Sequence, residues 1–120
     1  MLRQMLKSKI HRGTITDIQL DYEGSIACDP ELLRAADILP GEKVLVANLN
    51  NGARFETYAI VGEKRQISLR GAAARLGQIG DRVIVMAFGF MDDEEARRRP
   101  PAIVLVGERN SRCESPAYEK

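Results

Sequence analysis

The chain has 120 residues, of which 18 are Lys or Arg and 17 are Asp or Glu, so its formal net charge at pH 7 is +1. This length favours one domain with a modest hydrophobic core. The near-neutral charge provides no broad positive surface for nucleic acid or an anionic membrane. Hydrophobic residues make up 44% and charged residues 29% of the chain, which excludes a disordered protein.

Neither the cysteines nor the N-terminus indicates a metal, a disulfide framework or export. Cys28 and Cys113 are far apart, and neither has a second Cys or His at ligand spacing. Residues 1–13 are basic but lack the apolar segment of a secretory signal. No apolar run approaches the ~18 residues of a membrane-spanning helix. The expectation is a reduced, cytoplasmic protein that binds neither nucleic acid nor membrane.

The first third of the chain predicts a strand, a turn and a short helix. Residues 14–20 alternate polar with aliphatic side chains, as a half-buried strand does. Residues 22–26 follow as a tight turn. A two-turn helix is predicted over 30–37, because Asp29 suits the N-cap and Pro30 suits the first helical position.

The rest of the chain predicts further strands with short helices between them. Residues 44–49 and 55–61 flank a turn at 50–53 and indicate a hairpin. Further strands are predicted at 66–69, 82–90 and 102–106, and short helices at 71–76 and from Asp92 to before Pro100. Residues 108–120 are polar and aperiodic, so we expect a flexible tail outside a domain of residues 1–107.

Six or seven short strands with few helices favour a small closed β-barrel, because closure removes exposed strand edges. Between the first strand and the first helix lies the step Gly24–Ser25. Glycine reaches backbone geometries closed to other residues, so a serine hydroxyl following it can attack the preceding carbonyl. The dipeptide is common, and a simple turn remains the plainer interpretation of these residues alone.

Five segments in this order and spacing give the chain a clear resemblance. They are Met-Leu-Lys-Ser-Lys-Ile-His-Arg (5–12), Tyr-Glu-Gly-Ser (22–25), Asn-Gly-Ala-Arg-Phe-Glu-Thr-Tyr-Ala-Ile (51–60), Gly-Ala-Ala-Ala (71–74) and Met-Asp-Asp-Glu-Glu-Ala-Arg (91–97). The chain resembles the aspartate 1-decarboxylases, small pyruvoyl-dependent lyases that make β-alanine for pantothenate synthesis. The resemblance runs from residue 1 to about residue 106.

The resemblance implies a six-stranded double-psi β-barrel with short helices. It also implies a zymogen that cleaves itself between Gly24 and Ser25 into residues 1–24 and 25–120, and converts Ser25 into a pyruvoyl group. That group forms a Schiff base with L-aspartate and replaces pyridoxal phosphate as electron sink, with no metal. Family members are homotetramers of processed pairs with sites between adjacent subunits. Whether cleavage needs a maturation factor stays open.

The resemblance assigns two roles to the strand at 55–61. Tyr58 is the expected proton donor, and its ordinary pKa near 10 keeps it protonated at neutral pH. Thr57 is expected to bind substrate and to position the Gly24 carbonyl during processing. In an ideal strand Arg54 and Tyr58 share one face and Thr57 the other. Either a bulge occurs at Thr57, or it acts across a different wall or in a neighbouring subunit.

Most of the remaining expected site residues are expected to bind substrate. Arg54 suits bidentate recognition of a carboxylate, and Lys9 is expected to attract one. His11 is expected to be structural, or at most to hydrogen-bond near the site. Three small residues are expected to form a wall whose backbone amides contact the substrate: Gly71, Ala72 and Ala73.

The chain departs from the family pattern next to this wall. Arg70 stands where members usually carry Asn, Arg75 where they often carry His, and the turn at 62–66 is about two residues shorter. An Arg in place of Asn adds bulk and a fixed charge. Two hypotheses follow for Arg70: it contacts a substrate carboxylate, or it swings out to pair with an acidic neighbour.

Two other functions remain as alternatives. One is a poorly processed or substrate-shifted homologue on the same fold, in which the Arg70 pocket favours another acidic amino acid. The other is a small β-barrel that serves as a binding or regulatory module on DNA. The near-zero charge argues against the second.

Overall fold

The computed structural model describes residues 1–113 of the chain. The described residues form nine strands, two short α-helices and two short 3₁₀ helices. The strands are β1 (Arg3–Thr14), β2 (Asp17–Gln19), β3 (Ser25–Cys28), β4 (Lys43–Asn48), β5 (Arg54–Val61), β6 (Ile67–Arg70), β7 (Arg82–Met91), β8 (Ala102–Val106) and β9 (Arg112–Cys113). The helices are α1 (Pro30–Ala35), η1 (Gly71–Leu76), α2 (Asp93–Arg98) and η2 (Glu108–Asn110).

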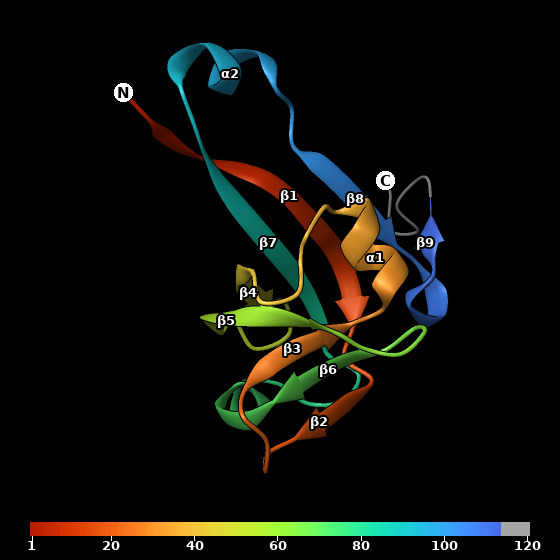
Figure 1. Cartoon of the computed structure of the whole chain (residues 1–120). Helices are drawn as coiled ribbons and strands as arrows, with labels where there is room; N and C mark the ends of the chain where they lie inside the picture. Colours follow the sequence, from red (N-terminus) through yellow and green to blue (C-terminus); the bar gives the residue numbers. More distant parts are fainter. Residues whose placement is uncertain (114–120) are drawn as a thin grey trace.

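The strands form one mixed sheet in the order β2-β6-β3-β5-β4-β7-β1-β8-β9. The long strands β1 and β7 run antiparallel side by side (Figure 1). The pairs β1–β8, β2–β6 and β3–β5 are parallel. The prediction of a mainly β protein with short helices is confirmed, and the mixed sheet agrees with a β-barrel. The nine strands include two very short ones, β2 and β9, beyond the six or seven expected.

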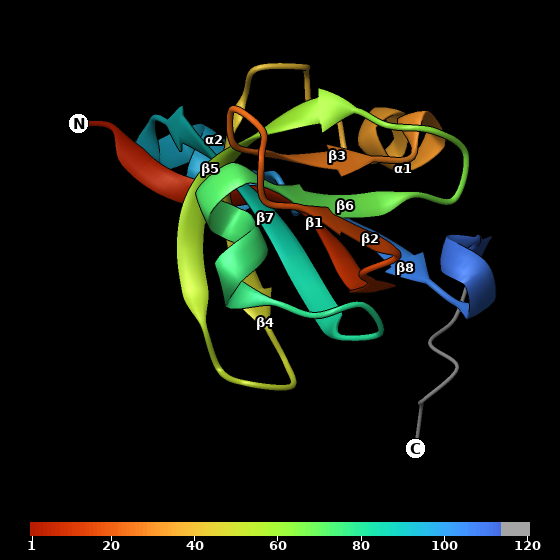
Figure 2. The ribbon, with the colours of Figure 1, turned by 90° about the horizontal axis from the view of Figure 1, so that it is seen from below.

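Strand β5 connects the two parts of this sheet. Its first five residues pair antiparallel with β4, ending with Tyr58 opposite Lys43. Its next residues pair in parallel with β3, beginning with Ala59 opposite Ile26. Figure 2 shows β5 bending from its partner β4 toward β3 and β6. Tyr58 therefore lies at the point where β5 changes partners.

The core consists of the aliphatic side chains that the strands turn away from solvent, closed on one side by α1. The helix contributes Leu32 and Leu33, and both are buried. The largest fully buried apolar side chains are Ile10, Ile15, Ile26, Leu32, Ile67, Leu69, Val44, Val46, Val83, Val85 and Val104.

The predicted short helices are confirmed, and their caps explain where they begin. The Asp29 carboxylate accepts a hydrogen bond of 2.7 Å from the backbone N–H of Glu31, at the start of α1. The Asp92 carboxylate accepts one of 2.8 Å from the N–H of Glu95, at the start of α2. Each carboxylate satisfies an N–H that the first helical turn leaves unpaired.

The first strand lies earlier than the alternation predicts. The prediction of a strand over residues 14–20 is confirmed only for the short β2 and is wrong for the rest, because β1 already ends at Thr14. The register of β1 against β7 shifts between Leu6 and Ser8 and again between His11 and Gly13. Each shift interrupts the two-residue period, so β1 shows no clean alternation.

A second strand lies where a turn was expected. Residues 25–28 form β3, which pairs with β5 and β6 in the sheet, and all four residues are buried, so side chains on both faces of the strand are covered. A strand covered on both faces has no alternating pattern that the sequence could show.

The predicted flexible tail is wrong for residues 108–113. The Asn110 side chain is 1% exposed, because its amide bonds both backbone groups of Thr14 and the carbonyl of Arg65. The rest of the predicted tail, 114–120, lies outside the described residues.

Among the helices that the structure describes, none has the length and apolar character to cross a membrane. Residues 1–113 also contain no group of three or more His, Cys, Asp or Glu placed to hold a metal ion.

Candidate active site

Ser25 is the first residue of β3 and is fully buried. Its hydroxyl oxygen has no hydrogen-bond partner within residues 1–113. The residue before it, Gly24, has φ +91°, a conformation that residues with a Cβ rarely adopt. A buried polar group without a partner is uncommon and points to a catalytic role or stored strain. Two of the three predicted processing residues, Gly24 and Ser25, therefore have an unusual local structure.

Gly71, the first residue of η1, lies directly against this segment. A Cβ added to Gly71 would lie 2.5 Å from the Gly24 nitrogen and 2.7 Å from the Tyr22 carbonyl oxygen. Its φ of +67° also favours glycine. Of the other two predicted wall residues, Ala73 is buried and Ala72 is exposed. Only the wall's first residue is shown in contact with the Gly24–Ser25 step.

Tyr58 and Ser25 occupy equivalent positions on neighbouring strands. Each is the residue immediately before the first pair of the parallel β3–β5 register, Ile26 opposite Ala59. Tyr58 is 38% exposed, whereas Thr57 is half-buried on the opposite face of β5. The pairing of β5 with β4 is continuous over residues 54–58, so the side chains alternate there without a bulge at Thr57.

Arg70 ends β6 directly opposite Ser25 in the antiparallel β3–β6 pairing. Its Nε donates a hydrogen bond of 3.3 Å to the Ser68 hydroxyl, and its guanidinium carbon lies 4.8 Å from the centre of the Tyr22 ring. Ser68 in turn donates to the Asp17 carboxylate at 2.7 Å. Arg70 is thus connected to Asp17 through the Ser68 hydroxyl and not by a direct ion pair, and both hypotheses for Arg70 stay predictions.

The charge of Arg70 acts on Asp17. The pKa of Asp17 lies below its ordinary value, mainly because the carboxylate accepts hydrogen bonds from Ser68 and Gln19, with the nearby positive charge of Arg70 contributing further. Tyr22, Ser68 and Asp17 were not predicted as part of the site. Only Tyr22, which lies in the matched segment 22–25, could have been found from the sequence, since β2 and β6 come together only in the fold.

The predicted carboxylate-binding residues lie on a different part of the sheet. Arg54 is aligned across the strands with Ala47, Ile84 and His11, and Lys9 is two residues away from His11 on β1. These residues point away from the core. Because adjacent strands lie about 4.8 Å apart, Arg54 and His11 are roughly 14 Å apart along the sheet. Within one chain, Arg54 and Lys9 therefore stand on well-separated strands of the sheet.

Lys9 and His11 share one side of β1, and the charge of Lys9 acts on His11. Partial burial lowers the pKa of His11, and the positive charges of Lys9 and Arg12 lower it further. His11 is therefore neutral at pH 7, and a neutral imidazole can donate one hydrogen bond and accept another.

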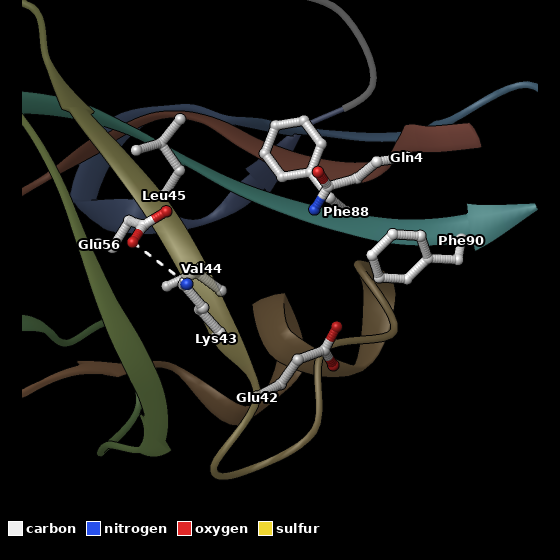
Figure 3. Close-up of a pocket in the computed structure, with 8 residues that line it drawn as sticks. All are labelled: Gln4, Glu42, Lys43, Val44, Leu45, Glu56, Phe88 and Phe90. Carbon is white, nitrogen blue, oxygen red and sulfur yellow. Dashed lines mark ion pairs between the residues drawn. The ribbon is translucent and has the colours of Figure 1, made fainter. Parts of the chain in front are cut away.

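The same outward face carries an open groove between β4 and β7. Phe88 and Phe90, which are 38% and 69% exposed, line it together with Leu45 from β4. Lys43 and Glu56 form an ion pair of 3.2 Å at its edge (Figure 3). Large exposed aromatic side chains rimmed by charges are typical of a surface that another protein covers.

The amino-acid sequence is similar to known proteins over most of the chain. The family model described as aspartate decarboxylase matches residues 1–113. An aspartate 1-decarboxylase of Pelotomaculum thermopropionicum is 58% identical over 112 residues, which cover 92% of this chain and 85% of the relative. The relatives of that name from Thermoanaerobacter pseudethanolicus and Campylobacter jejuni are 54% identical over 112 residues (92% and 96% covered) and 50% identical over 117 residues (97% and 93% covered). With a family match and this degree of identity, the chain belongs to the aspartate decarboxylase family.

Proposed function

We propose that this protein is a carboxy-lyase, EC 4.1.1.11, that converts L-aspartate into β-alanine and CO₂ for pantothenate synthesis. The family and the shared name of its relatives support this reaction. The observation that carries the proposal is the buried Ser25 hydroxyl, which lacks a partner among residues 1–113 and follows a glycine with φ +91°.

The proposal begins with cleavage of the chain by Ser25 itself. Its hydroxyl oxygen bonds to the Gly24 carbonyl carbon, the peptide C–N bond breaks, and the hydroxyl proton passes to the released amine. Loss of the Ser25 α-proton then expels the Gly24 carboxylate and leaves dehydroalanine. Water hydrolyses its imine tautomer, which releases ammonia and leaves a pyruvoyl group. The net change consumes one water and needs no oxidant.

The site fits such a group. A hydroxyl that binds no other side chain is free to turn toward the carbonyl, and burial keeps bulk water from the ester. The pyruvoyl carbonyl supplies the electron sink that decarboxylation requires. We assign this cofactor to Ser25, with no pyridoxal phosphate and no metal.

The chain's own residues then bind the aspartate and supply the proton that replaces the lost CO₂. Arg54 has the planar fork that grips a carboxylate, and Lys9 provides a second positive charge on the same outward face. Tyr58, on β5 beside the start of β3, delivers the proton that replaces the lost CO₂. Thr57 lies on the opposite side of β5 from Tyr58, so we assign it to the processing step.

We further propose a homotetramer, with each site completed by an adjacent copy. Arg54 and Lys9 lie several strands apart in one chain, so groups from an adjacent copy are expected to complete the site around one aspartate. The outward face that carries them also exposes Phe88 and Phe90. Another copy seated on this face would bury the aromatic rings and bring a second set of charged side chains to the site.

The experiment that tests the function follows the freshly synthesised chain by intact-mass spectrometry under denaturing conditions. The wild-type protein should split between Gly24 and Ser25, and the larger piece should carry a carbonyl in place of the serine amine. Ser25→Ala should stay whole and release no β-alanine. Ser8→Ala is the matched control, because Ser8 is also buried with an unpartnered hydroxyl among the described residues but does not follow glycine.

Two results would overturn the proposal. One is a wild-type chain that stays whole, with and without cell extract, and yields no β-alanine. The other is a Ser25→Ala chain that decarboxylates aspartate as fast as the wild type does.

A further inference from the structure

A continuous chain of side-chain contacts runs from β2 to the segment that precedes Ser25. The Ser68 hydroxyl donates to Asp17 Oδ2 at 2.7 Å and accepts from Arg70 Nε at 3.3 Å. The Arg70 guanidinium carbon lies 4.8 Å from the centre of the Tyr22 ring. Tyr22 is three residues before Ser25, so the contacts end beside the bond that is to be cut.

The direction of these hydrogen bonds determines how the Arg70 side chain is oriented. Because the Ser68 proton is given to Asp17, the serine oxygen can only accept from Arg70. The pKa of Asp17 lies below the ordinary carboxyl value, and the positive charge of Arg70 is one of the causes. The guanidinium is thus attracted toward Asp17 and hydrogen-bonded to Ser68, and its carbon lies over the Tyr22 ring.

The backbone around Arg70 holds the same segment from another side. Arg70 pairs with Ser25 in the β3–β6 register, and the next residue, Gly71, leaves no room for a Cβ against Gly24 and the Tyr22 carbonyl. Residues 70 and 71 therefore contact the segment 22–25 by backbone and by side chain. Tyr22 lies in a bend, and 49% of its surface faces solvent. The contact with Arg70 therefore restrains a ring that is otherwise half exposed.

We propose that Arg70 is a positioning residue for self-cleavage, which holds Tyr22 so that the Gly24 carbonyl carbon stays within reach of the Ser25 hydroxyl. The inference rests on the proposed function, because it concerns the first step at Ser25. That step is an isomerisation in which the Oγ–C bond forms, the C–N bond breaks and the hydroxyl proton moves to nitrogen. Arg70 takes no part in the bond changes; it restrains the segment in which they occur.

The test measures the first-order rate of cleavage by intact mass in freshly translated chains. Arg70→Met keeps an unbranched apolar stem and removes the charge and the donors of the guanidinium, and Tyr22→Leu removes the ring. Both should slow cleavage by about tenfold or more, because small misplacements of reacting atoms carry large rate penalties. Tyr22→Phe keeps the ring face and should cleave within about twofold of wild type.

A double variant separates a shared role from two independent ones. If the two side chains act through one contact, Arg70→Met with Tyr22→Leu should cleave no slower than the slower single variant. Arg75→Met is the matched control, because Arg75 is an exposed arginine on η1, and it should cleave at the wild-type rate. Tyr22 is largely exposed, so Tyr22→Leu tests the proposal even where an Arg70 variant fails to fold.

Three outcomes would overturn the role of Arg70 while self-cleavage stands. Arg70→Met could cleave at the wild-type rate, or the two effects could multiply in the double variant. Alternatively, cleavage could be unchanged while the KM for aspartate rises tenfold, which would make Arg70 a substrate contact. If the wild-type chain itself never splits, the proposed function fails and the role of Arg70 fails with it.

Discussion

Gly71 packs so closely against Gly24 that the Gly24 backbone leaves no space for a side chain at position 71. A Cβ there would meet the Gly24 nitrogen and Cα at 2.5 Å, a separation that real Cβ atoms do not show. The two glycines come from η1 and from the segment before β3, which are far apart in the sequence. The contact fixes the position of the Gly24 backbone relative to the buried Ser25.

Gly71→Ala is therefore expected to block self-cleavage, because the methyl group displaces Gly24 from Ser25. Intact-mass spectrometry should show a single uncut chain over a period in which the wild type is fully cut. Gly52→Ala is the matched control, since Gly52 also has positive φ (+78°) but no atom lies within 4 Å of its added Cβ. The control carries the backbone strain of about 1–2 kcal/mol without the clash, and should cleave normally. Equal cleavage of both variants would contradict the role of the contact.

The sequence predicted those parts of the site that depend on local signals. The caps Asp29 and Asp92 and the hairpin turn at 50–53 act over a few residues, so the predicted helices and the β4–β5 pair are found in the structure. The family resemblance supplied Ser25 and Tyr58 as reacting groups. The two-residue strand period, and not the resemblance, anticipated that Arg54 and Tyr58 share a face, since an unbulged strand alternates.

The contacts between distant segments could not be predicted from the sequence. Arg70, Ser68 and Asp17 meet only because β6 pairs with both β2 and β3. Strand β1 escaped prediction because its bulges disturb the period, and β3 because it is buried on both faces. The order in which strands pair depends on closing the whole sheet, which no short window of residues records.

Tyr58→Phe is expected to leave self-cleavage intact and to lower kcat for β-alanine formation by about 10²- to 10⁴-fold, the usual contribution of a positioned acid. The KM for aspartate should change little, because the hydroxyl acts after substrate is bound. Chromatographic assay of β-alanine on fully cleaved protein measures both constants. The matched control is Tyr22→Phe, whose hydroxyl has no assigned role in proton transfer. Full activity of Tyr58→Phe would remove this residue as the proton donor.

Asp17 is expected to titrate below the ordinary carboxyl pKa of 3.8, mainly because Ser68 donates a hydrogen bond to it. Ser68→Ala should raise its pKa, and removal of the second donor by Gln19→Ala should raise it less. A lowered carboxyl pKa stabilises the folded state fully above 3.8, and this contribution is lost as pH falls through the folded-state value. Carbon NMR titration of the uncut Ser25→Ala chain measures the shift. No change in Ser68→Ala would show that the serine does not hold the carboxylate.

Cys28 is expected to resist alkylation in the folded protein, although it lies on the same strand as Ser25. Burial raises the pKa of its thiol to about 12, and the negative charge of Asp29 adds to the effect. The protonated thiol is a poor nucleophile at pH 8. Mass spectrometry after iodoacetamide treatment should show modification of the half-buried Cys113 first, and of Cys28 only after denaturation. Rapid modification of native Cys28 would mean that β3 opens readily to solvent.

Asn110→Ala is expected to destabilise the fold by about 2–4 kcal/mol, because the change leaves buried backbone groups without partners. The Asn110 amide nitrogen donates to the carbonyls of Thr14 and Arg65, and its oxygen accepts from the Thr14 N–H at 2.8 Å. Urea denaturation of the uncut Ser25→Ala chain measures the loss, and Ser111→Ala is the neighbouring control with only a local bond to Glu108.

Loss of the Asn110 hydrogen bonds should also affect the processing site. Thr14 ends β1, and Arg65 lies two residues before β6, the strand that carries Arg70 opposite Ser25. In the chain that retains Ser25, Asn110→Ala should therefore slow cleavage as well as lower stability. A large loss of stability with an unchanged cleavage rate would show that β6 keeps its place beside β3 without the anchor from Asn110.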